Sequence, residues 1–177
     1  MEADWEFDVG GDSPLIEAYW LGLVDLRAHP ERVSEIRECR DLPGLSDVLL
    51  KLNAAESAVW TSKTDVFFPE AIDPYEMNAS ADEAGAAIAC YVDLLPRAHR
   101  AWSDQRRAEE YCRRLCARLA DQPLRCCRVD IAVRRAAVAE AYELGATAYA
   151  TACGSTAVEA RQRLSECLLA FAATVAE

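Results

Sequence analysis

The stretch ACGSTAVE, near the C-terminal end of the chain, places a cysteine, a glycine and two hydroxyl residues between a predicted strand and a predicted helix. Free backbone N–H groups at the helix start, with the hydroxyls of Ser155 and Thr156 after Gly154, can hold a phosphate or a carboxylate. Cys153 comes just before this turn, where the helix dipole could stabilise a thiolate. Cys153, Gly154, Ser155 and Thr156 are therefore candidate ligand-binding residues. Ordinary capping is the alternative, because Thr156 and Glu159 have the spacing of a capping box.

Two Arg-Ala-His triplets end at His29 and His99, which are the two histidines of the chain. If the fold brought them together with Arg27 and Arg97, the four side chains could form an anion site or an acid–base pair near neutral pH. Two exposed loop histidines are the alternative. We prefer it, since a histidine becomes a catalytic candidate only when geometry places it in a cleft. The catalytic residues therefore stay unknown.

Metal ligation is not expected. Residues 62–77, which span the end of the first strand of the regular region and the loop after it, carry Lys63, Asp65, Glu70, Asp73 and Glu76, but they lack the ligand spacing of a calcium loop. No Cys-x-x-Cys pair occurs, and most of the eight cysteines follow the apolar pattern of core residues. Cys126, next to another cysteine, is the one we expect to be more exposed. We therefore predict no metal and no cofactor.

The elements that would position these residues follow a regular order in the second two thirds of the chain. Apolar alternation predicts strands, and a period of three to four residues predicts helices. The predicted strands cover 57–68, 86–95, 124–135 and 144–153, and the predicted long helices cover 103–120 and 154–176. Two strand-strand-helix units make an α+β two-layer sandwich. We predict an antiparallel sheet of four strands, or five with an N-terminal strand, with both helices on one face, in a ββαββα order that is ferredoxin-like.

The N-terminal quarter is less regular. Residues 1–14 are polar and suggest an arm, 15–27 suggest a strand or a strand pair, and 28–44 suggest a connector. A short helix over 45–54 follows. We therefore divide the chain into an arm with an edge strand and connector (1–44) and an α+β domain (45–177), which together form a single globular domain.

Helices on one face leave the other face of the sheet open. Strand alternation predicts the side chains that lie on it. They are Tyr91, Asp93, Arg128, Asp130, Arg134 and Tyr149, together with Thr147 and Thr151. Such a mixture suits a ligand groove or a partner surface. A solvated face with ion pairs such as Asp93 with Arg128 is one alternative.

Two questions about this face stay open. The first strand could present either Lys63 and Asp65 or the alternating set that includes Trp60. The N-terminal arm, with its aromatic residues Trp5, Phe7, Tyr19 and Trp20, could also fold over the face.

Composition limits the function classes. The chain has 177 residues, 52% of them hydrophobic, and a net charge of −11 that disfavours binding to nucleic acid. It shows no apolar stretch of the roughly 18–20 residues that a spanning helix needs, and no secretory signal, so we expect no membrane association and a cytoplasmic location.

We expect a non-catalytic binding or dimerisation module that uses the open sheet face, with a second copy or another protein as partner. The chain shows no complete catalytic constellation, so enzymatic activity is uncertain and disfavoured. The alternative is an enzyme that acts on a small anionic metabolite, with the Gly154–Thr156 turn as anion site. Cys153, a histidine and Asp65 would then be its reacting groups.

Overall fold

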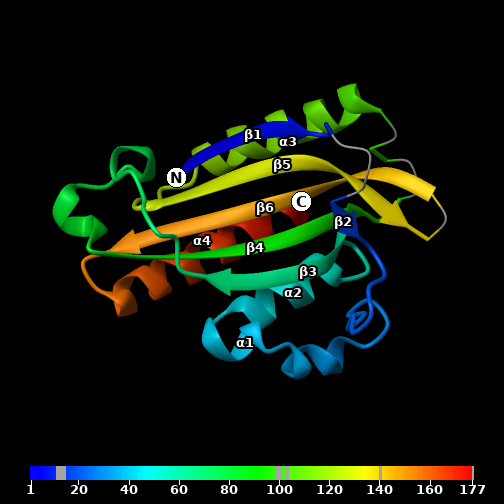
Figure 1. Ribbon diagram of the computed structural model, residues 1–177, viewed down its shortest axis with the longest axis horizontal. Coiled ribbons are helices and arrows are strands. Elements are labelled where there is room, and N and C mark those ends of the chain that lie inside the picture. Colours follow the sequence, from blue (N-terminus) through cyan, green and yellow to red (C-terminus); the bar gives the residue numbers. More distant parts are fainter. Residues whose placement is uncertain (11–14, 99–100, 103, 140, 177) are drawn as a thin grey trace.

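A six-stranded sheet lies against helices in the computed structural model, which describes residues 1–10, 15–98, 101–102, 104–139 and 141–176 (Figure 1). The strands are β1 (Glu2–Asp8), β2 (Ile16–Glu17), β3 (Val59–Phe67), β4 (Ala86–Pro96), β5 (Cys127–Val138) and β6 (Ala141–Gly154). The α-helices are α1 (Glu38–Asp41), α2 (Leu45–Asn53), α3 (Gln105–Ala120) and α4 (Ala157–Ala176), and the 3-10 helices are η1 (Pro30–Glu35), η2 (Tyr75–Met77) and η3 (Ala81–Ala84).

The strand order is β1-β5-β6-β4-β3, and the short β2 continues beyond β1 along β5. The pairs among β3, β4, β5 and β6 are antiparallel, whereas β1 and β2 run parallel to β5. The prediction of an α+β fold is confirmed. The predicted antiparallel sheet of four or five strands is not confirmed, because both N-terminal strands join it and make it mixed.

β1 was not predicted as a strand from the sequence, because its apolar residues alternate with acids, which are poor strand formers. Trp5 and Phe7 pack against the core, and their rings contact each other edge-to-face with centroids 5.6 Å apart. Asp4 and Asp8 lie on the opposite face of the strand. The expected strand over 15–27 is wrong apart from β2. Its aromatic residues pack instead of pairing, since Tyr19 lies against Trp60 with ring centroids 5.5 Å apart.

The core lies between the sheet and the helices. α3 contacts β1, α4 contacts β6, β4 and β5, and α2 contacts β3 and α4, so the three helices form one layer behind the sheet (Figure 1). Alternate residues of β5 point into this layer: Cys127, Val129, Ile131 and Val133. α3 and α4 bury the stripes that their sequence period predicts, including Leu115 and Phe171. The other residues of β5 are thereby left on the open face.

A β-bulge in β3 answers the question of which residues this strand presents. The register with β4 shifts between Thr61 and Thr64, so the side-chain parity changes within the strand. Trp60 lies opposite Leu95 before the shift, and Asp65 lies opposite Tyr91 after it. Both halves of the strand therefore contribute to the open face, from alternate sets of the predicted residues.

The two outermost strands, β1 and β3, each contain the same kind of local hydrogen bond. The backbone N–H of Trp5 donates to the Asp4 carboxylate, and the backbone N–H of Val66 donates to the Asp65 carboxylate, each at 2.8 Å. An aspartate thus takes up the backbone donor of the residue after it on each edge of the sheet.

None of the helices in the described ranges combines the length and the apolar character that a bilayer-spanning helix requires.

Candidate functional site

The middle of the open face carries one row of side chains that crosses the sheet. Tyr91 of β4 lies opposite Tyr149 of β6, which lies opposite Asp130 of β5. The row ends at Asp65 on β3 and Asp4 on β1, in register with Tyr91 and Asp130. The two tyrosine rings are 6.0 Å apart. A paired aromatic centre with carboxylates at both ends is therefore the main feature of this face.

A second group of side chains is joined by hydrogen bonds. Arg134 donates to the hydroxyl of Tyr149 at 2.8 Å and to the hydroxyl of Thr147 at 3.3 Å. The Thr147 hydroxyl donates in turn to Asp93 at 2.7 Å. Arg134 also pairs with Asp8, at 3.1 Å. The chain of bonds ties β1, β4, β5 and β6 together through polar side chains.

Asp93 is the buried member of this group, with 5% of its surface exposed. Burial raises the pKa of its carboxyl, and the hydrogen bond from Thr147 and the charges of Lys63 and Arg134 oppose this rise. Burial also raises the pKa of Tyr91, and the negative charge of Asp93 adds to it. A carboxyl with a perturbed pKa on an open face marks a candidate binding position.

Arg128 organises the end of the face next to β1. It pairs with Asp130 at 2.7 Å, and more loosely with Asp4 at 3.9 Å and Glu76 at 3.8 Å. The suggested cross-strand pair between Arg128 and Asp93 is thus replaced by a pair within β5 and contacts to two other segments. Glu76 comes from the loop between β3 and β4, which reaches across the sheet to β5 (Figure 1).

A hollow of about 180 Å³ lies between these groups. Ala132 forms part of its floor, and the surrounding polar side chains come from β1, β5 and β6. They are Asp4, Glu6, Arg128, Asp130 and Tyr149. With three carboxylates and one guanidinium, the lining favours a positively charged group from a partner.

The two ends of the open face are covered by the chain itself. At one end, a small core fills the space over the far part of the β5–β6 hairpin; it consists of Ile16, Ala18, Trp60, Leu95 and Ala136. At the other end, Met77 packs on Cys126 and Cys153. Of the aromatic residues that could have covered the face, Tyr19 lies over one end of it, against Trp60. Trp5 and Phe7 instead lie on the helix side of the sheet. The middle stays open.

The Gly154–Thr156 turn is already occupied by a side chain. The Glu159 carboxylate accepts from the backbone N–H of Ser155 at 2.9 Å and from its hydroxyl at 2.6 Å, and Thr156 accepts from the backbone N–H of Glu159 at 3.2 Å. Arg163 pairs with Glu159 at 2.5 Å. These donors thus cap α4, which is the alternative that the spacing of Thr156 and Glu159 suggested.

The thiol of Cys153 is fully buried, and burial raises its pKa to about 11. A thiol in this environment stays protonated at neutral pH, which is the opposite of what a nucleophile needs. Cys126, expected to be more exposed, is buried as well, because its backbone turns at a positive φ of 58° and its side chain enters the cluster with Met77 and Cys153.

Of the two histidines, only His29 is part of the described structure. It is exposed and lies 3.4 Å from Glu31, whereas the prediction for His99 falls outside the described residues. Arg27 binds Asp25 and stacks over Trp60, with its guanidinium 3.6 Å from the ring centroid. Arg97 donates to the backbone carbonyls of Asn53, Ala54 and Ser57. Both arginines therefore hold local structure.

Within the described residues, no three or more His, Cys, Asp or Glu side chains are grouped so that they could hold a metal ion. Of the acidic loop residues, Glu76 pairs with Arg128, and Asp73 accepts from the backbone N–H of Tyr75.

Four contributors to the open face were missing from the sequence-based list: Asp4, Glu6, Asp8 and Glu76. The alternation of acids with Ala3, Trp5 and Phe7 in EADWEFD is the pattern that could have identified the first three. Glu76 could not have been found in this way, because loop residues carry no period.

We compared the chain with protein-family models, with curated proteins and with solved structures, and none of the three comparisons found a match.

Proposed function

We propose that the protein is a binding module that holds a second polypeptide on its open sheet face, and that a second copy of the chain is this partner. The single observation that carries the proposal is the open middle of the sheet, where Tyr149 lines a hollow of about 180 Å³ and its ring lies 6.0 Å from that of Tyr91. A cytoplasmic location belongs to the same proposal.

The residue types support a protein partner. Tyrosine and arginine are enriched among the residues that contribute most to binding, because they bury large surfaces at little entropic cost and keep a polar end. Tyr91, Tyr149, Arg128 and Arg134 are all between fully buried and fully exposed, so they combine fixed positions with accessible surface. A partner would therefore meet a preorganised face.

The alternation of charge supports a second copy as partner. Carboxylates and guanidiniums lie on the same face, with Arg128 and Arg134 next to Asp4, Asp8 and Asp130. A twofold interface brings each patch against itself, so a face with both signs can pair its positive groups with the partner's negative ones. A face of one sign would repel its copy.

The test is sedimentation velocity and native mass spectrometry on the full chain over a wide concentration range, comparing wild type, Tyr91→Ala and Tyr75→Ala. We expect a dimer in the wild type and a dissociation constant raised about tenfold or more by Tyr91→Ala, as for an interface hot spot. Tyr75, which is 89% exposed and outside the row, is the matched control and should leave the dimer unchanged. A wild-type chain that stays monomeric, or equal effects of the two variants, would refute the proposal.

A further inference from the structure

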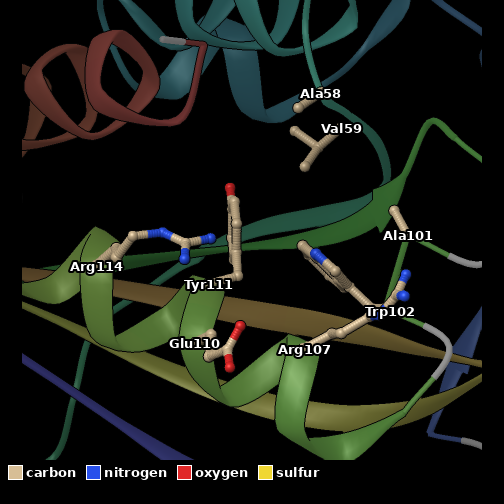
Figure 2. Close-up of a pocket in the computed structure, with 8 residues that line it drawn as sticks. All are labelled: Ala58, Val59, Ala101, Trp102, Arg107, Glu110, Tyr111 and Arg114. Carbon is tan, nitrogen blue, oxygen red and sulfur yellow. The ribbon is translucent and has the colours of Figure 1, made fainter.

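A second cavity lies on the helix side of the molecule, away from the open face. It has a volume of about 270 Å³ and is bordered by α3, by Trp102 and by the start of β3 at Val59 (Figure 2). An apolar cavity of about 150 Å³ is large enough for benzene. The space therefore suffices for a substituted aromatic ring.

One flank of α3 supplies most of the polar lining. Arg107, Glu110, Tyr111 and Arg114 follow the three-to-four-residue spacing that brings side chains onto one side of a helix. The neighbouring stripe, which includes Ala108 and Cys112, is buried against the sheet. The lining residues are thus held on a helix that the core fixes in place.

Tyr111 is the unusual member of this lining. Its hydroxyl oxygen is buried, yet it has no hydrogen-bond partner in the part of the chain that the structure describes. Figure 2 shows the hydroxyl directed across the cavity toward Ala58 and Val59. Burial raises the pKa of Tyr111 well above its usual value, so the phenol keeps its hydrogen and can donate it. A buried donor without an acceptor is costly, which points to an acceptor from outside the chain.

The charges around the cavity indicate what kind of acceptor this is. Glu110 pairs with Arg106 at 3.3 Å, and Arg107 lies 3.5 Å from Asp104. Arg114 makes no ion pair within the described ranges, and its guanidinium extends toward Tyr111 (Figure 2). A phenol donor and an unpaired guanidinium together suit a carboxylate.

Aromatic surface completes the site. The ring of Trp102 lies against that of Tyr111, with centroids 4.9 Å apart, and Trp102 is 6% exposed. Aromatic faces of this kind favour a flat apolar group beside them.

We propose that this cavity binds a small aromatic carboxylate, with Tyr111 and Arg114 holding the carboxylate and Trp102 contacting the ring. The site is separate from the open sheet face, so it stands or falls independently of the proposed dimer.

The test uses phenylacetate as probe and the full chain labelled with 5-fluorotryptophan, in which Trp102→Phe assigns the resonance of Trp102 among the four tryptophans. We expect phenylacetate to shift the Trp102 fluorine resonance in a saturable manner. Phenylacetamide, which has the same shape without the charge, should bind at least about tenfold more weakly, since charged hydrogen bonds are the stronger ones.

Two variants test the assigned residues. Tyr111→Phe and Arg114→Gln should each weaken phenylacetate binding by about tenfold, the effect of losing one bond to a charged group. Arg113→Gln is the matched control, because Arg113 is exposed on the same helix, pairs with Glu109 and does not line the cavity. Thermal melting checks that each variant is folded.

Three outcomes would overturn the proposal. The first is the absence of a saturable shift, which would mean that the cavity holds water only. The second is equal binding of phenylacetate and phenylacetamide. The third is binding that survives both Tyr111→Phe and Arg114→Gln.

Discussion

Thr147 donates its hydroxyl hydrogen to the carboxylate of Asp93 across 2.7 Å, and both residues are almost completely buried within the polar centre of the open face. The oxygen of Thr147 also accepts from Arg134 at 3.3 Å, so the threonine links a positive group to a buried acid. This position explains how the Asp93 carboxyl can lie within the sheet without a direct ion pair to any of the described residues.

Thr147→Val should destabilise the protein by about 1–3 kcal/mol, because the valine keeps the shape but leaves the Asp93 carboxyl without its donor. Urea unfolding at neutral pH measures this loss. Thr151→Val, on the same face of β6 but half-buried, is the control and should have a smaller effect. Similar losses for the two variants would show that the bond to Asp93 contributes little.

Because of Asp93, the free energy of unfolding should also decrease as pH rises. Its pKa in the folded chain lies above the ordinary value of 3.8, so the folded state binds more protons than the unfolded state between these two values. Stability conferred by Asp93 is therefore present below pH 3.8 and is lost as pH rises through the folded pKa.

Asp93→Asn removes this titration. Relative to wild type, the variant should become more stable as pH is raised from about 3.5 to 7, by about 1.4 kcal/mol for each unit by which the folded pKa is raised. Urea unfolding across this range gives the difference directly. A difference that does not change with pH would contradict the raised pKa.

The cysteines should react at very different rates. Cys39 is half-buried, whereas the other seven thiols are buried. We expect Ellman's reagent to modify one thiol in the native protein, faster at alkaline pH because burial raises the pKa of Cys39, and all eight after unfolding in urea. Cys39→Ser should abolish the native reaction. Rapid labelling of Cys126 or Cys153 in that variant would contradict the burial of this pair.

Gly145→Ala should destabilise the fold by about 1–3 kcal/mol through overpacking. A Cβ atom at Gly145 would lie 2.9 Å from Ile16 Cδ1 and 3.0 Å from the backbone oxygen of Leu94, where the small core covers the sheet. Gly10→Ala is the control, since its Cβ would have no neighbour within 4 Å among the residues that the structure describes. Thermal melting compares the two, and equal melting temperatures would mean that the covered end is loosely packed.

The open face was the most predictable part of the structure. Strands with strict alternation, such as the one that carries Arg128 and Arg134, disclose which side chains share a face, because the period of two permits only one arrangement. The six residues named from the sequence do lie on that face. Whether they bind a partner is a separate question, to which alternation gives no answer.

The errors have physical causes. The bulge in β3 changes the parity within one strand, and no local composition marks where it occurs. The capping of α4 by Glu159 was among the possibilities, yet only the geometry shows its carboxylate on Ser155. The contribution of Tyr111 could not be expected, because an apolar helix stripe predicts burial and says nothing of whether a hydroxyl finds a partner.

The aspartates on the two outermost strands limit how copies of the chain can join. Asp4 and Asp65 each occupy a backbone donor that another strand would need, and they add charge to the margins of the sheet. Edge-to-edge pairing, the route by which sheets grow into fibres, is therefore disfavoured at both ends. Association through the open face, by contrast, consumes the binding surface of both copies, so assembly of this protein would stop at two chains.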